Sequence, residues 1–172
     1  MERASAVTMK GNPLTLVGPE LKEGDKAPDF SALDNGLSEV RLTDSNGKAR
    51  LISVVPSLDT PVCSTQTKTF NDQLNQLGDK VAAYTVSADL PFAQGRFCSS
   101  EGISNMKVIS DYRDMDFGEK YGLKIKELRL LARAVLVVDK NDTITHMQIV
   151  PEVTQEPDYT TAMEALKKAA AE

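Results

Sequence analysis

Two cysteines, Cys63 and Cys98, are the side chains of this chain best suited to nucleophilic chemistry. The apolar run 51–55 precedes Cys63, and Pro56 ends that run because proline has no backbone N–H with which to extend a β-ladder. Beyond Cys63 apolar residues recur at i, i+4 and i+7, which predicts a helix with Pro61 in its first turn; these residues are Phe70, Leu74 and Leu77. The pattern predicts that Cys63 lies in the first turn of a helix that follows a buried strand.

This position favours an ionised thiol. Unpaired backbone N–H groups and the positive end of the helix dipole stabilise an anion at a helix N-terminus. The thiolate is the nucleophilic form of cysteine, and an ordinary thiol with a pKa of about 8.5 is only slightly ionised at neutral pH. Thr60 is placed to direct its hydroxyl at the sulfur or at an approaching oxygen, and Pro56 and Pro61 stiffen the loop. A cysteine after an apolar strand is, however, most often a small buried hydrophobe, so position alone does not establish reactivity.

The remaining composition excludes several functional classes. Two cysteines and one histidine, His146, cannot complete a tetrahedral zinc site without carboxylates, and neither cysteine belongs to a Cys-x-x-Cys pair, so we expect no metal. Phosphate- and flavin-binding motifs are absent, so we expect no cofactor. Since lasting disulfides are unusual in a reducing cytosol, a bond between the two cysteines is expected to be transient redox chemistry. We expect His146 to face solvent or a partner, without a catalytic role.

Length and charge indicate a soluble cytoplasmic protein of one domain, residues 1–172. No stretch approaches the roughly 20 apolar residues of a membrane span, and the first ten residues lack the layout of a signal peptide. The net charge of −5 argues against a nucleic-acid partner, because phosphate binding requires a basic surface. We therefore expect neither membrane nor nucleic acid among the partners.

The hydrophobic pattern predicts an α/β protein. Residues 7–17 indicate an N-terminal β-hairpin that turns at 11–13, and Asp89 is predicted to cap a short helix that contains Cys98 near its end. The other expected elements are strands at 50–55, 80–87, 107–110, 133–139 and 143–150 and helices at 116–122 and 159–170. A strand–helix–strand unit followed by a hairpin and a terminal helix indicates a thioredoxin-like fold: a mixed central sheet flanked by helices, with the N-terminal hairpin as an addition.

Three segments carry a resemblance to a known family. Pro56, Thr60 and Cys63 reproduce the Pro-x-x-x-Thr-x-x-Cys signature of the peroxiredoxins. The segment 87–98, Ser-Ala-Asp-Leu-Pro-Phe-Ala-Gln-Gly-Arg-Phe-Cys, and the segment 130–134, Leu-Leu-Ala-Arg-Ala, are similar to those of the thiol peroxidase subfamily, the atypical two-cysteine type. Residues 156–159 look similar too, so the resemblance spans nearly the whole chain.

The resemblance implies a function and roles for individual residues. Cys63 is then the peroxidatic cysteine and Cys98 the resolving one, joined after oxidation by an intramolecular disulfide, with Thr60 and Arg133 around the reacting oxygens. The family further implies reduction of hydrogen peroxide and alkyl hydroperoxides in antioxidant defence, recycling by thioredoxin, and a homodimer. Because the two cysteines lie on different helices, we expect one or both helices to unwind locally when the disulfide forms.

Two alternatives remain open from the residues themselves. A thioredoxin-like disulfide reductase needs a second cysteine three residues after the first, where Gln66 stands, and this argues against it. A peroxide-responsive redox sensor or adaptor, in which the disulfide changes a binding surface, is a second alternative that peroxide turnover would distinguish. Without the resemblance, Arg133 would be interpreted as a solvated residue at the end of a strand.

Overall fold

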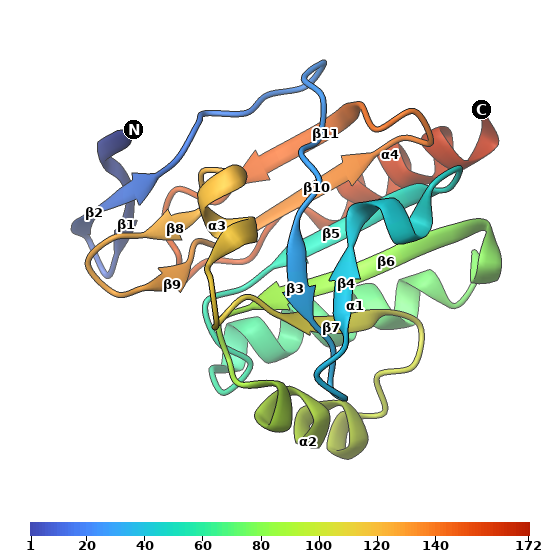
Figure 1. Cartoon of the computed structure of the whole chain (residues 1–172), viewed down its shortest axis with the longest axis horizontal. Coiled ribbons are helices and arrows are strands. Elements are labelled where there is room, and N and C mark those ends of the chain that lie inside the picture. The colour runs from blue at the N-terminus through green and yellow to red at the C-terminus, as the bar shows by residue number, and fades with distance from the viewer.

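The computed structural model describes all 172 residues and has two β-sheets (Figure 1). The larger, mixed sheet has seven strands in the order β11-β10-β5-β6-β7-β3-β4, in which β5, β6 and β7 are parallel. Its strands are β3 (Ser31–Leu33), β4 (Glu39–Arg41), β5 (Ala49–Val54), β6 (Val81–Ser87), β7 (Lys107–Ser110), β10 (Ala134–Val138) and β11 (Ile144–Ile149). The helices are α1 (Pro61–Leu74), α2 (Pro91–Glu101), α3 (Asp116–Lys120) and α4 (Tyr159–Ala171), with short 3₁₀ turns at Leu42–Ser45 and Gly78–Lys80. The expected thioredoxin-like α/β fold with a mixed sheet is confirmed.

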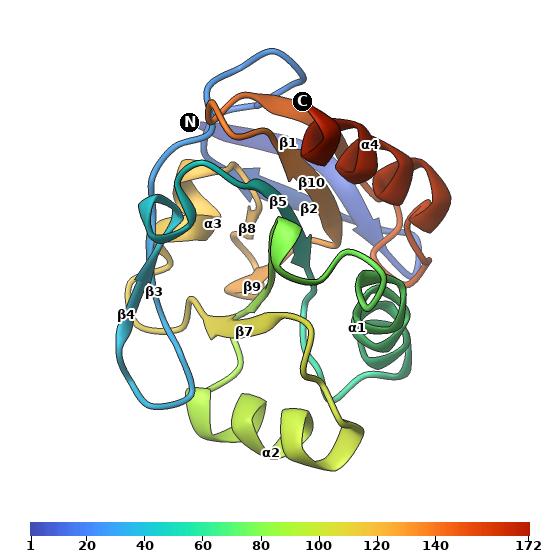
Figure 2. The same ribbon diagram turned by 90° about the vertical axis from the view of Figure 1, so that its right-hand side faces the viewer.

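Strands β5 and β10 are buried on both faces, which explains their continuous apolar sequences. Alternate residues point to opposite sides: Ile52 and Leu136 belong to one core, and Leu51 and Val135 to the other. Figure 2 shows α1 and α4 on one side of this sheet and α3 on the other, with α2 beside β7. The strand ends that carry the candidate residues are thus fixed by two cores.

Helix α1 begins where the sequence predicts, with Thr60 as N-cap and Pro61 as first residue. Phe70 and Leu74 are buried against the sheet, and the Phe70 ring meets the Tyr159 ring of α4 edge-on at 5.1 Å. Leu77 lies beyond the helix, which ends at Leu74. The apolar face of α1 therefore fixes the helix against β5 and α4, and with it the position of Cys63.

The N-terminal strands β1 (Glu2–Met9) and β2 (Asn12–Val17) form the expected hairpin, with two corrections. The hairpin starts at residue 2, not 7, and its turn is Lys10–Gly11, where both residues have positive φ. Asn12 and Pro13, predicted in the turn, are paired in β2. The hairpin continues into a second sheet of order β1-β2-β8-β9, since β2 pairs with β8 (Lys124–Ile125) and β8 with β9 (Leu130–Leu131).

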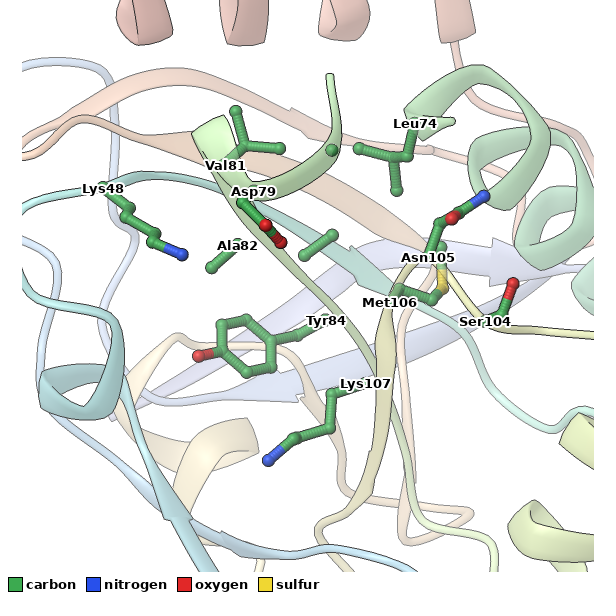
Figure 3. A pocket seen from close by; sticks show the side chains of 12 residues that line it. Lys48, Leu74, Asp79, Val81, Ala82, Tyr84, Ser104, Asn105, Met106 and Lys107 are labelled. Carbon is green, nitrogen blue, oxygen red and sulfur yellow. The ribbon is translucent and has the colours of Figure 1, made fainter. Parts of the chain in front are cut away.

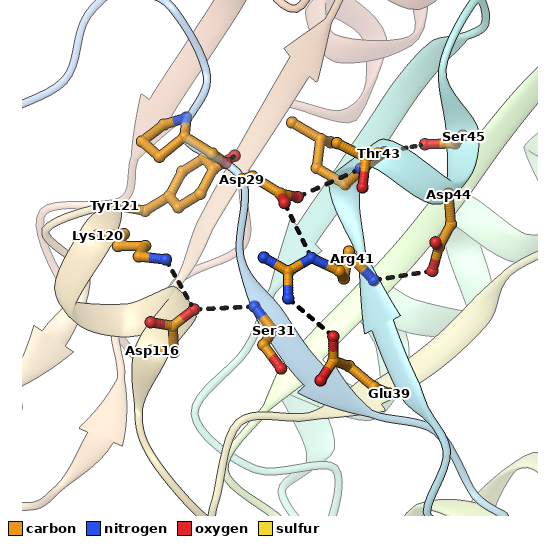
Figure 4. Close-up of polar contacts among 12 residues, drawn as sticks. Asp29, Ser31, Glu39, Arg41, Thr43, Asp44, Ser45, Asp116, Lys120 and Tyr121 are labelled. Carbon is orange, nitrogen blue, oxygen red and sulfur yellow. Dashed lines mark hydrogen bonds and ion pairs between the residues drawn. The ribbon is translucent and has the colours of Figure 1, made fainter.

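The β3–β4 edge of the large sheet is attached to its surroundings by polar contacts (Figure 4). Asp29 accepts hydrogen bonds from the Arg41 guanidinium at 3.0 Å and from the Thr43 backbone, and Asp116 of α3 accepts one from the Ser31 backbone at 2.8 Å. Phe30, between these contacts, is fully buried. The edge strands are therefore held to both α3 and the core.

Two predicted environments are wrong. Asp89 does not cap α2, whose N-cap is Leu90; its carboxylate instead bonds to the loop before Cys63. The His146 side chain is only 12% exposed, with Nδ1 3.8 Å from Glu23, so it does not face solvent. Phe92, on α2, is 67% exposed. None of the helices combines the length and apolar character that crossing a lipid bilayer requires.

Candidate active site

Cys63 is the third residue of α1, the helix that follows the carboxyl end of β5. β5 ends at Val54, two residues before the buried Pro56, and residues 56–60, the Cys63 loop, lead into the helix. The first hydrogen bond of the helix runs from the Ser64 backbone N–H to the Thr60 carbonyl at 3.0 Å, so earlier N–H groups have no acceptor within the helix. The Cys63 side chain is fully buried beside these groups. This is the anion-stabilising position that the sequence predicts.

The Arg133 side chain lies next to the Cys63 sulfur. Its Nη2 donates to Cys63 Sγ at 3.3 Å, its Nη1 to Gln66 Oε1 at 3.0 Å and its Nε to the Val153 carbonyl at 2.8 Å. The arginine is 2% exposed and takes part in no salt bridge with a carboxylate. A buried charge without an opposite charge is costly. The Cys63 thiolate is the one group in contact that would supply it.

Gln66, one turn after Cys63, is a part of this site that sequence reasoning did not identify. It is fully buried, and its amide links two elements: Oε1 accepts from Arg133, while Nε2 donates to Ser53 Oγ of β5 at 2.8 Å. Its position at i+3 from Cys63 and one turn before Phe70 places it on the helix face toward the sheet. A polar residue on the helix face that packs against the sheet was the sequence feature that could have identified Gln66. Gln66 fixes one branch of the guanidinium, so that the other branch points at the sulfur.

Thr60 makes a different contact from the one expected. Its hydroxyl donates to the Ser57 carbonyl at 3.0 Å, and its backbone N–H bonds to the same carbonyl. The residue is exposed and its hydroxyl makes no hydrogen bond to Cys63. In this arrangement Thr60 closes the turn of the Cys63 loop immediately before α1.

Cys98 is a half-buried free thiol on α2, and Cys63 is free as well. Cys98 packs against a small apolar cluster that includes Cys63, Val55, Leu58 and Val108. Burial raises the pKa of Cys98, and a hydrogen bond from the Asn35 side chain opposes that shift. The structure thus brings both cysteines to one cluster from two helices, without a bond between them.

Comparison with known proteins identifies the family. The family model described as Redoxin matches residues 22–163. The chain belongs to the redoxin family. A thiol peroxidase of Halalkalibacterium halodurans is 55% identical over 96% of this chain and 99% of its own length, and one of Bacillus subtilis is 53% identical over 94% and 96%. A crystal structure of a peroxiredoxin-like protein from Aquifex aeolicus superposes with a TM-score of 0.90 at 44% identity, covering 96% of this chain and 98% of that one.

Identity at this level over nearly the whole chain makes this redoxin a peroxiredoxin-type thiol peroxidase, an oxidoreductase. The expected family and class of activity are confirmed. The disulfide-reductase alternative does not fit these relatives, and the sensor alternative is not favoured by them.

The N-terminal hairpin of this redoxin supports Arg133 from behind. The Val153 N–H donates to the Thr8 carbonyl of β1 at 2.8 Å, and the Val153 carbonyl accepts from Arg133. Thr8 N–H bonds in turn to the Pro151 carbonyl at 2.8 Å. Residues from the first strand and from the segment after β11 therefore both contribute to the position of the guanidinium.

A hollow of about 410 Å³ is lined by neither cysteine (Figure 3). It is lined at the amino ends of β6 and β7, by residues such as Val81 and Lys107, whereas Cys63 follows the carboxyl end of the parallel strand β5. The labelled lysines, Lys48 and Lys107, are exposed. The hollow and the thiol are at opposite ends of the parallel strands, so the hollow is not part of the thiol site.

Proposed function

We propose that this thiol peroxidase reduces hydrogen peroxide and alkyl hydroperoxides at Cys63. The thiolate sulfur attacks one oxygen of the hydroperoxide, the O–O bond breaks, and the leaving oxygen takes a proton and departs as water or alcohol. The sulfur, oxidised by two electrons, keeps the other oxygen as a sulfenic acid. The observation that carries the proposal is the 3.3 Å contact between the buried Arg133 guanidinium and Cys63 Sγ.

Arg133 would act twice in this step. In the resting enzyme its charge favours the thiolate, and in the transition state it stabilises negative charge that spreads from sulfur to the two oxygens. Its donors are fixed beforehand by Gln66 and Val153, so little reorganisation is needed during the reaction. We assign Pro56 and Thr60 to the shape of the loop, with the Thr60 hydroxyl turning from Ser57 toward a bound hydroperoxide.

Cys98 is proposed to resolve the intermediate. Its thiol attacks the sulfenic sulfur, a Cys63–Cys98 disulfide forms, and water leaves. The shared apolar cluster of the two residues supports this pairing. Because Cys63 is fully buried in α1 and Cys98 lies in α2, we propose that one or both helices unwind locally to allow the bond. Thioredoxin then reduces the disulfide by thiol exchange, which completes a cycle that serves antioxidant defence.

We further propose that residues 1–172 form one domain that works as a cytoplasmic homodimer without a cofactor. The small sheet and the large sheet contribute to the same core cluster, which supports one domain. Leu90 and Phe92 are large apolar side chains exposed at the start of α2, which supports a second copy of the chain as partner. Sedimentation analysis of the wild type and of Phe92→Ser tests the dimer.

Peroxide consumption with thioredoxin, thioredoxin reductase and NADPH tests the function. We expect many turnovers by the wild type, none by Cys63→Ser, and a single oxidation without cycling by Cys98→Ser. Ser99→Ala, next to Cys98 on the exposed side of α2, is a matched control and should cycle normally. A wild type that consumes one equivalent and stops would instead indicate the sensor, and turnover by Cys63→Ser would exclude the proposed site.

A further inference from the structure

Asp89, in the connection from β6 to α2, links the segments that carry the two cysteines. Its Oδ1 accepts from Ser57 Oγ at 2.7 Å, and its Oδ2 from the Leu58 backbone N–H at 2.8 Å and from Ser87 Oγ at 2.7 Å. Ser57 and Leu58 belong to the Cys63 loop, while Asp89 leads into the helix of Cys98. We call Asp89, Ser57, Leu58 and Ser87 the Asp89 cluster. The cluster joins the two segments by side-chain bonds on one carboxylate.

The Asp89 side of the cluster is itself firmly held. The Ser110 hydroxyl of β7 donates to the Asp89 carbonyl. Gln94 of α2, fully buried, donates its amide to Ser87 Oγ at 3.0 Å and to the Ile109 carbonyl at 2.9 Å. The carboxylate is therefore fixed relative to β6, β7 and α2, and the Cys63 loop is the part that is attached to it.

The charge on Asp89 strengthens this attachment. Asp89 forms no salt bridge, so its hydrogen bonds are its stabilising partners within the chain. Hydrogen bonds to an ionised acceptor are roughly twice as strong as neutral ones. Two of the three come from the Cys63 loop, so movement of this loop away from α2 breaks both at once. The Asp89 cluster consequently opposes any rearrangement that carries Cys63 out of its pocket.

We propose that Asp89 is a positioning residue that holds the Cys63 loop in the conformation that meets peroxide, and that releasing its bonds to Ser57 and Leu58 is part of the movement that brings Cys63 to Cys98. The inference rests on the proposed function. It places the control of disulfide formation in a carboxylate that contacts neither sulfur. Weakening the Asp89 cluster should therefore accelerate disulfide formation. A general loss of structure would instead slow both the reaction of Cys63 with peroxide and the formation of the disulfide.

Two variants and one matched control test this assignment. Asp89→Asn keeps the side-chain shape but replaces one acceptor oxygen by a donor. Ser57→Ala removes the bond between the loop and Asp89, together with the bond that Ser57 Oγ accepts from the Asp59 N–H inside the loop. Asp139→Asn is the control: Asp139 also accepts two backbone N–H bonds in a turn, from Asn141 and Thr143, remote from both cysteines. Amide hydrogen exchange at Leu58 and Thr143 reports the bonds directly, and rapid-quench mass spectrometry after one equivalent of peroxide reports sulfenic acid and disulfide.

In Asp89→Asn we expect about tenfold faster exchange at Leu58 and about tenfold faster conversion of sulfenic acid to disulfide, since one charged hydrogen bond corresponds to at least this factor. Ser57→Ala should show the same direction with a smaller change. Asp139→Asn should accelerate exchange only at Asn141 and Thr143, without changing exchange at Leu58 or the rate of disulfide formation. Disulfide formation at or below the wild-type rate in both test variants, with Leu58 freed, would overturn the proposal, as would unchanged exchange at Leu58. Should the wild type reduce no peroxide, the proposed function fails, while the Leu58 exchange still tests the cluster.

Discussion

Arg133 and Cys63 are 70 positions apart in the sequence, yet the guanidinium Nη2 lies 3.3 Å from the thiol sulfur. Both side chains are almost completely buried, and neither contacts a carboxylate. The pair combines a permanent cation with the one neighbour that can become an anion.

Replacement of Arg133 by methionine should slow the reaction of Cys63 with hydrogen peroxide by about 100-fold or more, the usual effect of removing one preorganised donor to a developing charge. Stopped-flow measurement of a single turnover gives this rate. Arg133→Lys keeps a charge but cannot donate to Gln66, Val153 and Cys63 together, so an intermediate rate is expected. A rate within threefold of wild type in folded Arg133→Met would contradict the role.

Gln66→Met should reduce the same rate by about tenfold and destabilise the fold by about 1–3 kcal/mol, because Arg133 Nη1 loses its acceptor and Ser53 its donor in a buried place. Gln66→Glu keeps an acceptor for Arg133 but gives the guanidinium a carboxylate that competes with the Cys63 thiolate, so it should not restore the rate. Urea unfolding separates the loss of stability from the loss of rate. A rate within threefold of wild type in folded Gln66→Met would show that the Gln66 acceptor does not position Arg133.

The rate of disulfide formation should continue to increase with pH above the range in which an ordinary thiol ionises. Burial raises the pKa of Cys98, and the Asn35 hydrogen bond opposes this; since the thiolate is the attacking form, the rate should rise about tenfold per pH unit below that pKa. Asn35→Ala should move the profile to higher pH, whereas Asn46→Ala, in an exposed turn elsewhere, should not. A profile that levels off below pH 8 would contradict the raised pKa.

Ionisation of Asp111 should make the free energy of unfolding depend on pH. Burial raises the pKa of Asp111 to about 6, although the N–H groups of Gly118 and Phe117 donate to it, while the unfolded value is 3.8. A raised folded pKa means that the stabilising contribution is complete below pH 3.8 and is lost as pH rises through 6. Between pH 4 and 7 wild type should therefore lose about 2–3 kcal/mol relative to Asp111→Asn. Parallel unfolding curves across this range would contradict the shift.

Short sequence patterns predicted the features that depend on residues close together in the chain. The apolar residues of β5, Pro56 two residues beyond its end and the Phe70–Leu74 face of α1 are sufficient to place Cys63 at a helix N-terminus. The contact with Arg133 could not be derived that way, because it depends on β10 pairing beside β5 across a long stretch of chain. Only the resemblance to the peroxiredoxins indicated that Arg133 belongs to the site of Cys63.

The residues that were missed share one cause: their partners are distant in sequence. The sequence indicates Gln66 only as the residue that breaks a Cys-x-x-Cys pair and Asp89 only as a local helix cap, whereas each bonds across elements. The strands β3, β8 and β9 have three residues or fewer, too short to show a period. The second sheet, which depends on β8 and β9, was therefore not predicted.

The bond between Thr8 and Val153 has a consequence for how the protein is made. On the ribosome β1 emerges early, but Val153, which bonds to both Thr8 of this strand and Arg133, is translated near the end of the chain. Until then the guanidinium lacks its Val153 acceptor and the sulfur lacks an ordered cation. In a nascent chain the contact between Arg133 and Cys63 thus lacks this support until synthesis is nearly complete.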